Sequence, residues 1–144
     1  MTVATILRHK GYQVFSVDPR RSIAEVVQVL SSHRIGAVIV KDSADQLIGL
    51  VSERDVVHSL AANGIPTLEM TAGQLMTRNL KTVTPHTTEA EAMTAMTIGR
   101  CPHLPVLDEG VLIGLISIGD VVKARIMQAE QDVDSLRTYV AHSA

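Results

Sequence analysis

The chain has 144 residues, of which 46% are hydrophobic and only 2% aromatic, and its formal net charge is −2. This length fits one ordinary domain or two very small ones that share a core, and the scarcity of aromatic residues means that the core is built from aliphatic side chains. The charges are scattered, without a basic stripe or aromatic residues for stacking, which excludes a typical nucleic-acid binder and an electrostatic membrane anchor.

The N-terminal segment, MTVATILRHKGYQ, predicts a short helix over VATILRHK. Its apolar stretch is too short for a signal peptide and ends in basic residues. No apolar run in the chain approaches the roughly 18 residues of a membrane-spanning helix. Cys101 is the only cysteine, so an internal disulfide is excluded and a cytoplasmic location is predicted.

The next stretch predicts a strand, a helix, two strands and a final helix. The first strand reads QVFSV. The following helix opens at Ser22, with Glu25 completing a capping box, and apolar residues then recur at helical spacing. The runs AVIV and LIGLV, separated by the polar turn KDSADQ, predict two paired strands, and the final helix begins at Ser52.

An internal repeat organises the whole chain. The first motif, LIGLVSERDVV at residues 47–57, returns as the second motif, LIGLISIGDVV at residues 112–122, with eight of eleven positions identical. A shift of 66 residues also places residues 17–42 on residues 83–108 without a gap. Self-similarity of this kind indicates a duplicated structural unit.

The second copy predicts the same elements: a short helix (AGQLMTR), a strand (LKTV), a helix capped by Thr88 and Glu91, two strands (LPVL and VLIGLI) and a last helix from Ser117. The order β-α-β-β-α describes an α+β unit with its helices on one face of a small sheet. A copy of about 60 residues buries too little alone, so we expect the two to pack sheet to sheet about a pseudo-twofold axis. The predicted copies are residues 1–66 and 67–128, followed by a C-terminal helical extension at residues 129–144.

The two copies resemble the CBS domain, named for cystathionine β-synthase. The resemblance rests on the repeated motif, in which an apolar pair, Gly, an apolar pair and Ser precede two variable residues, Asp and Val-Val, and it covers about residues 1–128. CBS domains occur in pairs, and the family implies a regulatory sensor module that binds an adenosyl ligand in clefts between the paired copies. The resemblance implies AMP first, with ATP, ADP, S-adenosylmethionine or NAD as alternatives.

The family also implies which residues line two clefts, with the motif Asp holding the ribose hydroxyls and the motif Ser reaching ribose or phosphate. One cleft would use Leu50, Ser52, Arg54, Asp55, the backbone from Met76 to Lys81, Cys101 and Pro102. The other would use Leu115, Ser117, Gly119, Asp120 and His103, with Tyr12, Gln13, Ile35 and Gly36 at the adenine edge. In this scheme Arg54 and His103 approach phosphate groups.

The two clefts cannot be equivalent. Glu53-Arg54 in the first motif corresponds to Ile118-Gly119 in the second, so only the first motif carries a cation beside its Asp. Many relatives place a basic residue just before the position of His103, where this chain has Pro102. One site is therefore expected to be empty or to prefer a ligand with fewer phosphates.

Each Ser-x-x-Asp sequence has a second interpretation, as a capping box that opens the last helix of its copy. A cap needs no ligand, so the alternative function is a structural homodimer or scaffold with vestigial ligand sites. The two interpretations are compatible, because a helix N-terminus presents free N–H groups that suit a phosphate.

Catalytic chemistry has little support in the sequence. Cys101 and His103 would face the same side of a strand, but Pro102 interrupts them and no third group orients them. The six histidines show no metal-ligand spacing, and neither glycine-rich phosphate-binding motif is present. We therefore predict no catalytic residue, no metal site and no required cofactor, and a regulated partner protein that the sequence does not identify.

The C-terminal tail departs from the repeat. It carries an apolar seam spaced 4, 3, 4, 3, 4, made of Val122, Ile126, Ala129, Val133, Leu136 and Val140. This is the heptad pattern of a coiled coil. We predict one helix over residues 118–141 that helps to hold a homodimer, with folding of the tail onto its own chain as the alternative.

Overall fold

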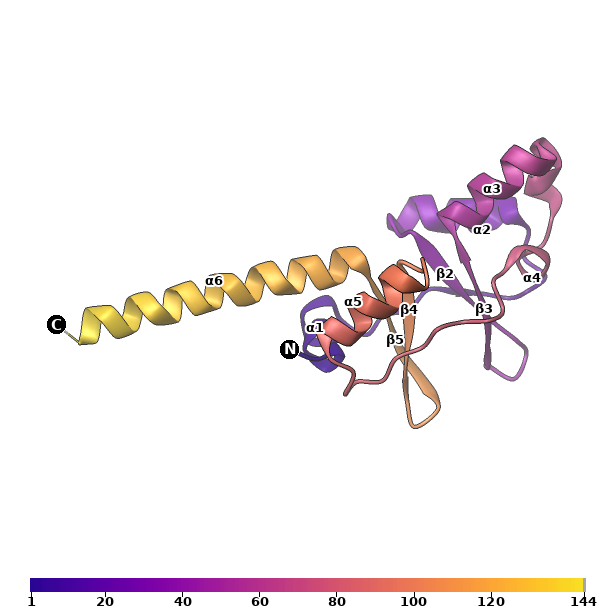
Figure 1. The fold of residues 1–144 in the computed structure, drawn as a ribbon. Coiled ribbons are helices and arrows are strands. Elements are labelled where there is room, and N and C mark those ends of the chain that lie inside the picture. The colour runs from indigo at the N-terminus through magenta and orange to yellow at the C-terminus, as the bar shows by residue number, and fades with distance from the viewer. Residues whose placement is uncertain (144) are drawn as a thin grey trace. The chain divides into compact units, whose positions relative to one another are not determined.

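The computed structural model describes residues 1–143, which contain six α-helices, five strands and one 3-10 helix (Figure 1). The elements in chain order are α1 (Val3–Lys10), β1 (Ser16–Val17), α2 (Ile23–His33), β2 (Ala37–Lys41), β3 (Leu47–Ser52), α3 (Glu53–Asn63), η1 (Ile65–Glu69), α4 (Ala72–Leu75), α5 (Glu89–Ile98), β4 (His103–Asp108), β5 (Val111–Ser117) and α6 (Ile118–His142). The α+β class and the long C-terminal helix are confirmed.

Two compact units make up the chain, and each contains one of the repeated motifs. Residues 13–80 form the first-motif unit. The second-motif unit joins residues 1–12 to the chain from Lys81 onward. The compact units and the repeated copies divide the chain differently, because the N-terminal helix α1 belongs to the compact unit of the second motif. The boundaries of the copies at residues 1–66 and 67–128 stay a prediction.

The first-motif unit has the predicted order β1-α2-β2-β3-α3. Its sheet has the order β1-β2-β3, with β1 parallel to β2 and β2 antiparallel to β3. The aliphatic stripe of α2 packs on this sheet, and the buried core includes Ile23, Val26, Leu30, Val38 and Val51. The strand predicted over QVFSV is shorter than expected, because only Ser16 and Val17 pair with β2.

The second-motif unit lacks the first strand that LKTV predicted. Its sheet contains only β4 and β5, and Val83 forms an isolated parallel bridge with Val106. The reason is Pro105, which has no N–H to donate. In the first-motif unit the N–H at the corresponding position, Ile39, donates to the Phe15 carbonyl at 3.1 Å and extends the pairing.

The predicted helix caps at Ser22 and Thr88 are half confirmed. Each hydroxyl accepts the backbone N–H three residues on, from Glu25 at 3.2 Å and from Glu91 at 3.1 Å. The two glutamate side chains contact the cap hydroxyl and do not complete the box at the cap backbone N–H. Complete boxes form instead at Ser52, Ser117 and Thr71, the last of which was not predicted.

The first helix of each repeated copy, which is α1 in the first copy and α4 in the second, packs on the remaining elements of the other copy. In the second-motif unit, the N-terminus of α1 is fixed by a bond of 2.8 Å from Val3 N–H to the Thr87 carbonyl. In the first-motif unit, the corresponding bond joins Ala72 N–H of α4 to the Arg21 carbonyl, also at 2.8 Å. The β-bridges match as well, since Thr2 pairs with Thr88 and Ser22 pairs with Thr71. The exchange is therefore reciprocal.

The glycine of each motif permits this exchange. A Cβ on Gly114 would lie 2.7 Å from Leu7 Cδ2, and one on Gly49 would lie 2.4 Å from Met76 Sδ. Leu7 belongs to α1, and Met76 is the C-cap of α4. Only glycine lets α1 approach β5, and α4 approach β3, so closely. The glycine that both copies share therefore has a packing role.

Candidate functional site

Each motif places its Ser and Asp at the N-terminus of the last helix of its unit. Asp55 N–H donates to Ser52 Oγ at 3.2 Å, and Ser52 N–H donates to Asp55 Oδ2 at 2.9 Å. The second motif repeats this geometry, with Asp120 N–H to Ser117 Oγ at 3.2 Å and Ser117 N–H to Asp120 Oδ2 at 2.8 Å. Both motifs are therefore capping boxes, as one interpretation of the sequence required.

Capping uses only one oxygen of each carboxylate. Oδ2 of Asp55 accepts the N–H and the hydroxyl of Ser52, and Oδ2 of Asp120 accepts the N–H of Ser117 and pairs with Lys10. Oδ1 of each carboxylate keeps its acceptor capacity, and both side chains are only partly buried. A carboxylate at a helix N-terminus can therefore cap the helix with one oxygen and accept hydroxyl groups of a ligand with the other.

A loop from the same unit lies against each helix N-terminus. The Gly36 carbonyl accepts the N–H of Glu53 at 2.9 Å, and the Pro102 carbonyl accepts the N–H of Ile118 at 3.1 Å. Ile35 and Gly36 thus lie beside the first motif, and Cys101 and Pro102 lie beside the second. The sequence assigned these loops to the opposite motifs, and that grouping across the two units stays a prediction.

The chain after α4 runs beside the first motif. Thr77 and Leu50 form an antiparallel bridge, with N–H to carbonyl distances of 3.1 and 2.9 Å. This brings part of the predicted Met76–Lys81 segment next to the motif strand. Lys81 itself belongs to the other unit, where it lines a shallow apolar hollow with Ala90, Thr94 and Ala95 of α5.

His103 and Ser117 are direct cross-strand partners on β4 and β5. His103 therefore lies in the same unit as Ser117 and Asp120, and its predicted place in a ligand cleft stays a prediction. The thiol of Cys101 is half-buried and donates to the Ala95 carbonyl at 3.6 Å, at the end of α5. This contact fits a structural cysteine better than a nucleophile.

The remaining predicted residues differ in exposure. Leu50 and Leu115 are buried at the ends of their strands, whereas Arg54 and Gly119 are exposed in the first turns of α3 and α6. Tyr12 and Gln13 are also exposed, and they belong to different units. Their predicted place at an adenine edge stays a prediction.

Lys10 is a site residue that the sequence did not reveal. Its ammonium group lies 2.7 Å from Asp120 Oδ2 and also donates to the Leu115 carbonyl. The side chains of Lys10 and Asp120 are 30% and 21% exposed. Among the described residues, Asp55 has no such cation, so the two motifs differ in charge as well as in sequence. The sequence did not predict the contact of Lys10 with Asp120, because the repeat assigns α1 to the first copy.

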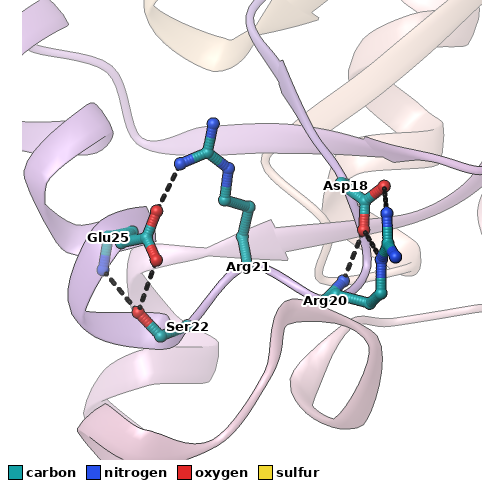
Figure 2. A network of polar contacts seen from close by, with 5 residues as sticks. All are labelled: Asp18, Arg20, Arg21, Ser22 and Glu25. Atoms are coloured by element: carbon teal, nitrogen blue, oxygen red, sulfur yellow. Dashed lines mark hydrogen bonds and ion pairs between the residues drawn. The ribbon is translucent and has the colours of Figure 1, made fainter.

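A second cluster of charges lies on the first-motif unit, at the start of α2 (Figure 2). Figure 2 shows two separate ion pairs, Arg20 on Asp18 at 3.1 Å and Arg21 on Glu25. The hydrogen bond from Arg20 lowers the pKa of the Asp18 carboxyl, and the hydrogen bond from Arg21 lowers the pKa of the Glu25 carboxyl. These contributions are present above the ordinary carboxyl pKa and disappear as the pH falls through the lowered values.

The cluster around Asp18 and Glu25 is a poor candidate for a ligand site. Its charges already neutralise each other in pairs, and its side chains are largely exposed. Exposed pairs of this kind contribute little to stability because water screens them. We regard the cluster as a solvated surface network that orders the loop before α2.

Two structural features are absent from residues 1–143. No group of three or more His, Cys, Asp or Glu side chains is arranged to hold a metal ion in this part of the chain. None of the helices described combines the length and the apolar character that crossing a bilayer requires.

Comparisons with known proteins agree with the repeat. A family model for the CBS domain matches residues 3–62 and residues 72–126. A CBS domain-containing protein, CBSX3, mitochondrial, from Arabidopsis thaliana is 32% identical over 123 residues, which cover 83% of this chain. The matched region spans only 60% of that relative's length.

Solved structures give the same result. The CBS-domain containing protein ATU1752 from Agrobacterium tumefaciens superposes with a TM-score of 0.84 at 41% identity, covering 86% of this chain and 92% of that one. CBSX2, solved in complex with AMP, superposes with a TM-score of 0.71 at 26% identity, covering 89% of this chain and 98% of that one.

Proposed function

Because this chain belongs to the CBS domain family, we propose that it is a regulatory module that binds an adenine nucleotide or a related adenosyl ligand, with AMP as the first candidate. The observation that carries the proposal is that each motif caps its helix through Oδ2 of Asp55 or Asp120, which leaves acceptor capacity on Oδ1 at a helix N-terminus. The complex of the relative CBSX2 with AMP supports the same choice of ligand.

The chemistry of each motif suits the two polar parts of AMP. The Asp Oδ1 can accept hydrogen bonds from ribose hydroxyls while Oδ2 continues to cap the helix. The first turn of α3 or α6 offers the positive end of a helix dipole to the phosphate. Arg54, exposed in the first turn of α3, adds a cation near the first motif.

Lys10 makes the second motif different. In the structure it neutralises Asp120, so a ligand at this motif must either share the carboxylate with Lys10 or displace it. The phosphate of AMP would give the Lys10 ammonium group another anion to contact. We therefore propose that the two motifs have unequal affinities, and that Lys10 sets the preference of the second.

A module of this kind acts by changing populations of conformations. A ligand shifts a conformational equilibrium only by the difference between its affinities for the two states. We propose that the protein works as a homodimer and that ligand binding alters its contact with a partner protein. The cytoplasmic location predicted from the single cysteine stays a prediction, and the relative CBSX3 is described as mitochondrial.

The first prediction concerns the two motif carboxylates. Asp120→Asn and Asp55→Asn should each weaken AMP binding at the changed motif by roughly tenfold to hundredfold, because a hydrogen bond to a charged group contributes about 1.5–3 kcal/mol. Asn can still accept the N–H of the motif Ser, so the helix cap should survive. Equilibrium dialysis with AMP measures the loss, and thermal unfolding checks that the fold is intact.

Ser22→Ala is the matched control for these variants. It removes the cap of α2, a different helix of the first-motif unit, and it should cost about 1 kcal/mol of stability without changing AMP binding. If both Asp variants bind AMP as well as the unchanged protein, the motifs are caps only. Failure of every adenosyl ligand to bind would favour the scaffold alternative.

The second prediction is that bound ligands remain chemically intact. Incubation of the protein with ATP, AMP or S-adenosylmethionine should release no product, because the half-buried thiol of Cys101 donates to the Ala95 carbonyl, as a structural cysteine does. Chromatography of the nucleotide after incubation measures this. Hydrolysis that persists through purification and disappears in Cys101→Ala or His103→Ala would show that the protein is an enzyme.

A further inference from the structure

The second half of α6 has no partner within its unit. Val121 and Ala124 are buried, and Arg125 contacts Glu89 of α5 at 2.5 Å. Beyond this ion pair every residue from Ala129 to Ser143 is exposed. The seam residues Val133, Leu136 and Val140 are 48%, 63% and 58% exposed. The helix is continuous (Figure 1), so the tail does not fold back on itself. Its apolar stripe stays exposed.

The stripe has the composition of a two-stranded coiled coil. With Ile126, Val133 and Val140 at the a positions, the d positions hold Val122, Ala129 and Leu136. In parallel coiled coils, β-branched residues at a with Leu at d favour two strands, and Leu136 is the Leu among these d positions. Most helical stability in proteins comes from packing of an apolar face, so the seam is best covered by an occupant with the same spacing. A second copy of this chain supplies one.

We propose that the α6 helices of two copies pair in parallel and in register. The evidence for the direction is the charge of the residues that flank the seam. The e positions hold Lys123, Glu130 and Arg137, and the g positions hold Arg125, Asp132 and Tyr139. In a parallel pair each g residue faces the e residue of the following heptad on the other helix. Asp132 then faces Arg137 of the second copy, and Arg125 faces Glu130.

Three alternative arrangements oppose like charges. In an antiparallel pair with the whole seam aligned, e faces e and g faces g, so Glu130 and Asp132 each face their own copies and Lys123 faces Arg137. A parallel pair shifted by one heptad sets Arg125 against Arg137 or Asp132 against Glu130. Of the two arrangements that align the whole seam, only the parallel pair in register sets every charged contact against an opposite charge. Arg125 is 73% exposed despite its contact with Glu89, so it retains donors for a second carboxylate.

A disulfide at the seam tests the direction. In the full chain carrying Cys101→Ser, Val140→Cys places identical thiols opposite each other only if the helices are parallel and in register. Mild oxidation should then give at least tenfold more covalent dimer than Thr138→Cys, which lies on the outer face of the same helix turn. Equal yields, or mixed dimers that form only when Val140→Cys is combined with Val122→Cys, would overturn the parallel arrangement.

The charges provide an independent test. Asp132→Arg and Arg137→Asp should each raise the dissociation constant of the dimer roughly tenfold, since each change turns attraction into repulsion on both sides of the seam. An equal mixture of the two variants should restore the affinity, because every facing pair is then opposite in charge. Light scattering over a dilution series measures both effects. Failure of the mixture to recover would contradict the proposed register.

The inference rests on the homodimer proposed above, and its failure is distinguishable from failure of the ligand proposal. Truncation after Gln128 removes most of the seam and should give a monomer at concentrations where the full chain is a dimer. A truncated protein that remains dimeric at every concentration would overturn the inference. AMP binding by the truncated protein is measured separately, since neither motif lies in the removed segment.

Discussion

Replacing Leu7 by alanine should lower the free energy of unfolding by about 2–5 kcal/mol, the usual cost of a large cavity in a core. Leu7 is fully buried in the core of the second-motif unit, beside Gly114. The loss should therefore be local to that unit. Native-state hydrogen exchange should show reduced protection in β4 and β5, while β2 and β3 keep theirs.

Leu30→Ala is the matched control for Leu7→Ala. Leu30 lies in α2 and packs in the core of the first-motif unit, so its replacement should reduce protection in β2 and β3 instead. The two variants together locate α1 by experiment. If Leu7→Ala reduced protection in β2 and β3 and left β4 and β5 unchanged, the reciprocal exchange of α1 and α4 would be wrong.

Gly49→Ala should destabilise the first-motif unit by about 1–3 kcal/mol, the range seen when a packed interior receives extra atoms. The added Cβ would lie 2.4 Å from Met76 Sδ, 2.8 Å from Cγ and 3.0 Å from Cβ. Rotation of the thioether alone cannot relieve the contact with Cβ, so α4 must shift away from β3. Chemical denaturation of the variant measures the loss.

A double variant separates this contact from a general effect of alanine. Met76→Ala removes the two closest atoms, so Gly49→Ala should cost less in that background than in the unchanged protein. Gly119→Ala is the control for the substitution itself. Its Cβ meets nothing nearer than Ser117 Oγ at 3.7 Å, and its position in α6 predicts a gain of about 0.5–1 kcal/mol. Equal costs of Gly49→Ala in both backgrounds would contradict the packing explanation.

The candidate site was only partly predictable from sequence. The Ser-x-x-Asp spacing identified both capping boxes because the contacts of a cap lie within one helix turn. Lys10 was not predictable, because its partner Asp120 is more than a hundred residues away and no local pattern links them. Which atoms of Asp55 and Asp120 remain free to accept a ligand also depended on the folded geometry.

The sequence by itself determined the features whose causes are local or repeated. The repeat established two copies of an α+β unit, and periodic apolar residues located α2, α5 and the full length of α6 within a few residues. Hydroxyl residues identified the helix starts because they satisfy N–H groups that a helix leaves unpaired. The seam on the tail was equally visible, since heptad spacing is a property of one helix.

Only the tertiary structure decided which compact unit α1 and α4 each join. It also decided where the pairing of β-strands ends. Both compact units have aliphatic cores, so the hydrophobic pattern of α1 does not predict which unit it joins. The choice depends on backbone bonds such as Val3 to Thr87, which join distant segments. The missing strand near Val83 has the same kind of cause, because LKTV is a plausible strand that lacks a donor at Pro105, over twenty residues later in the chain.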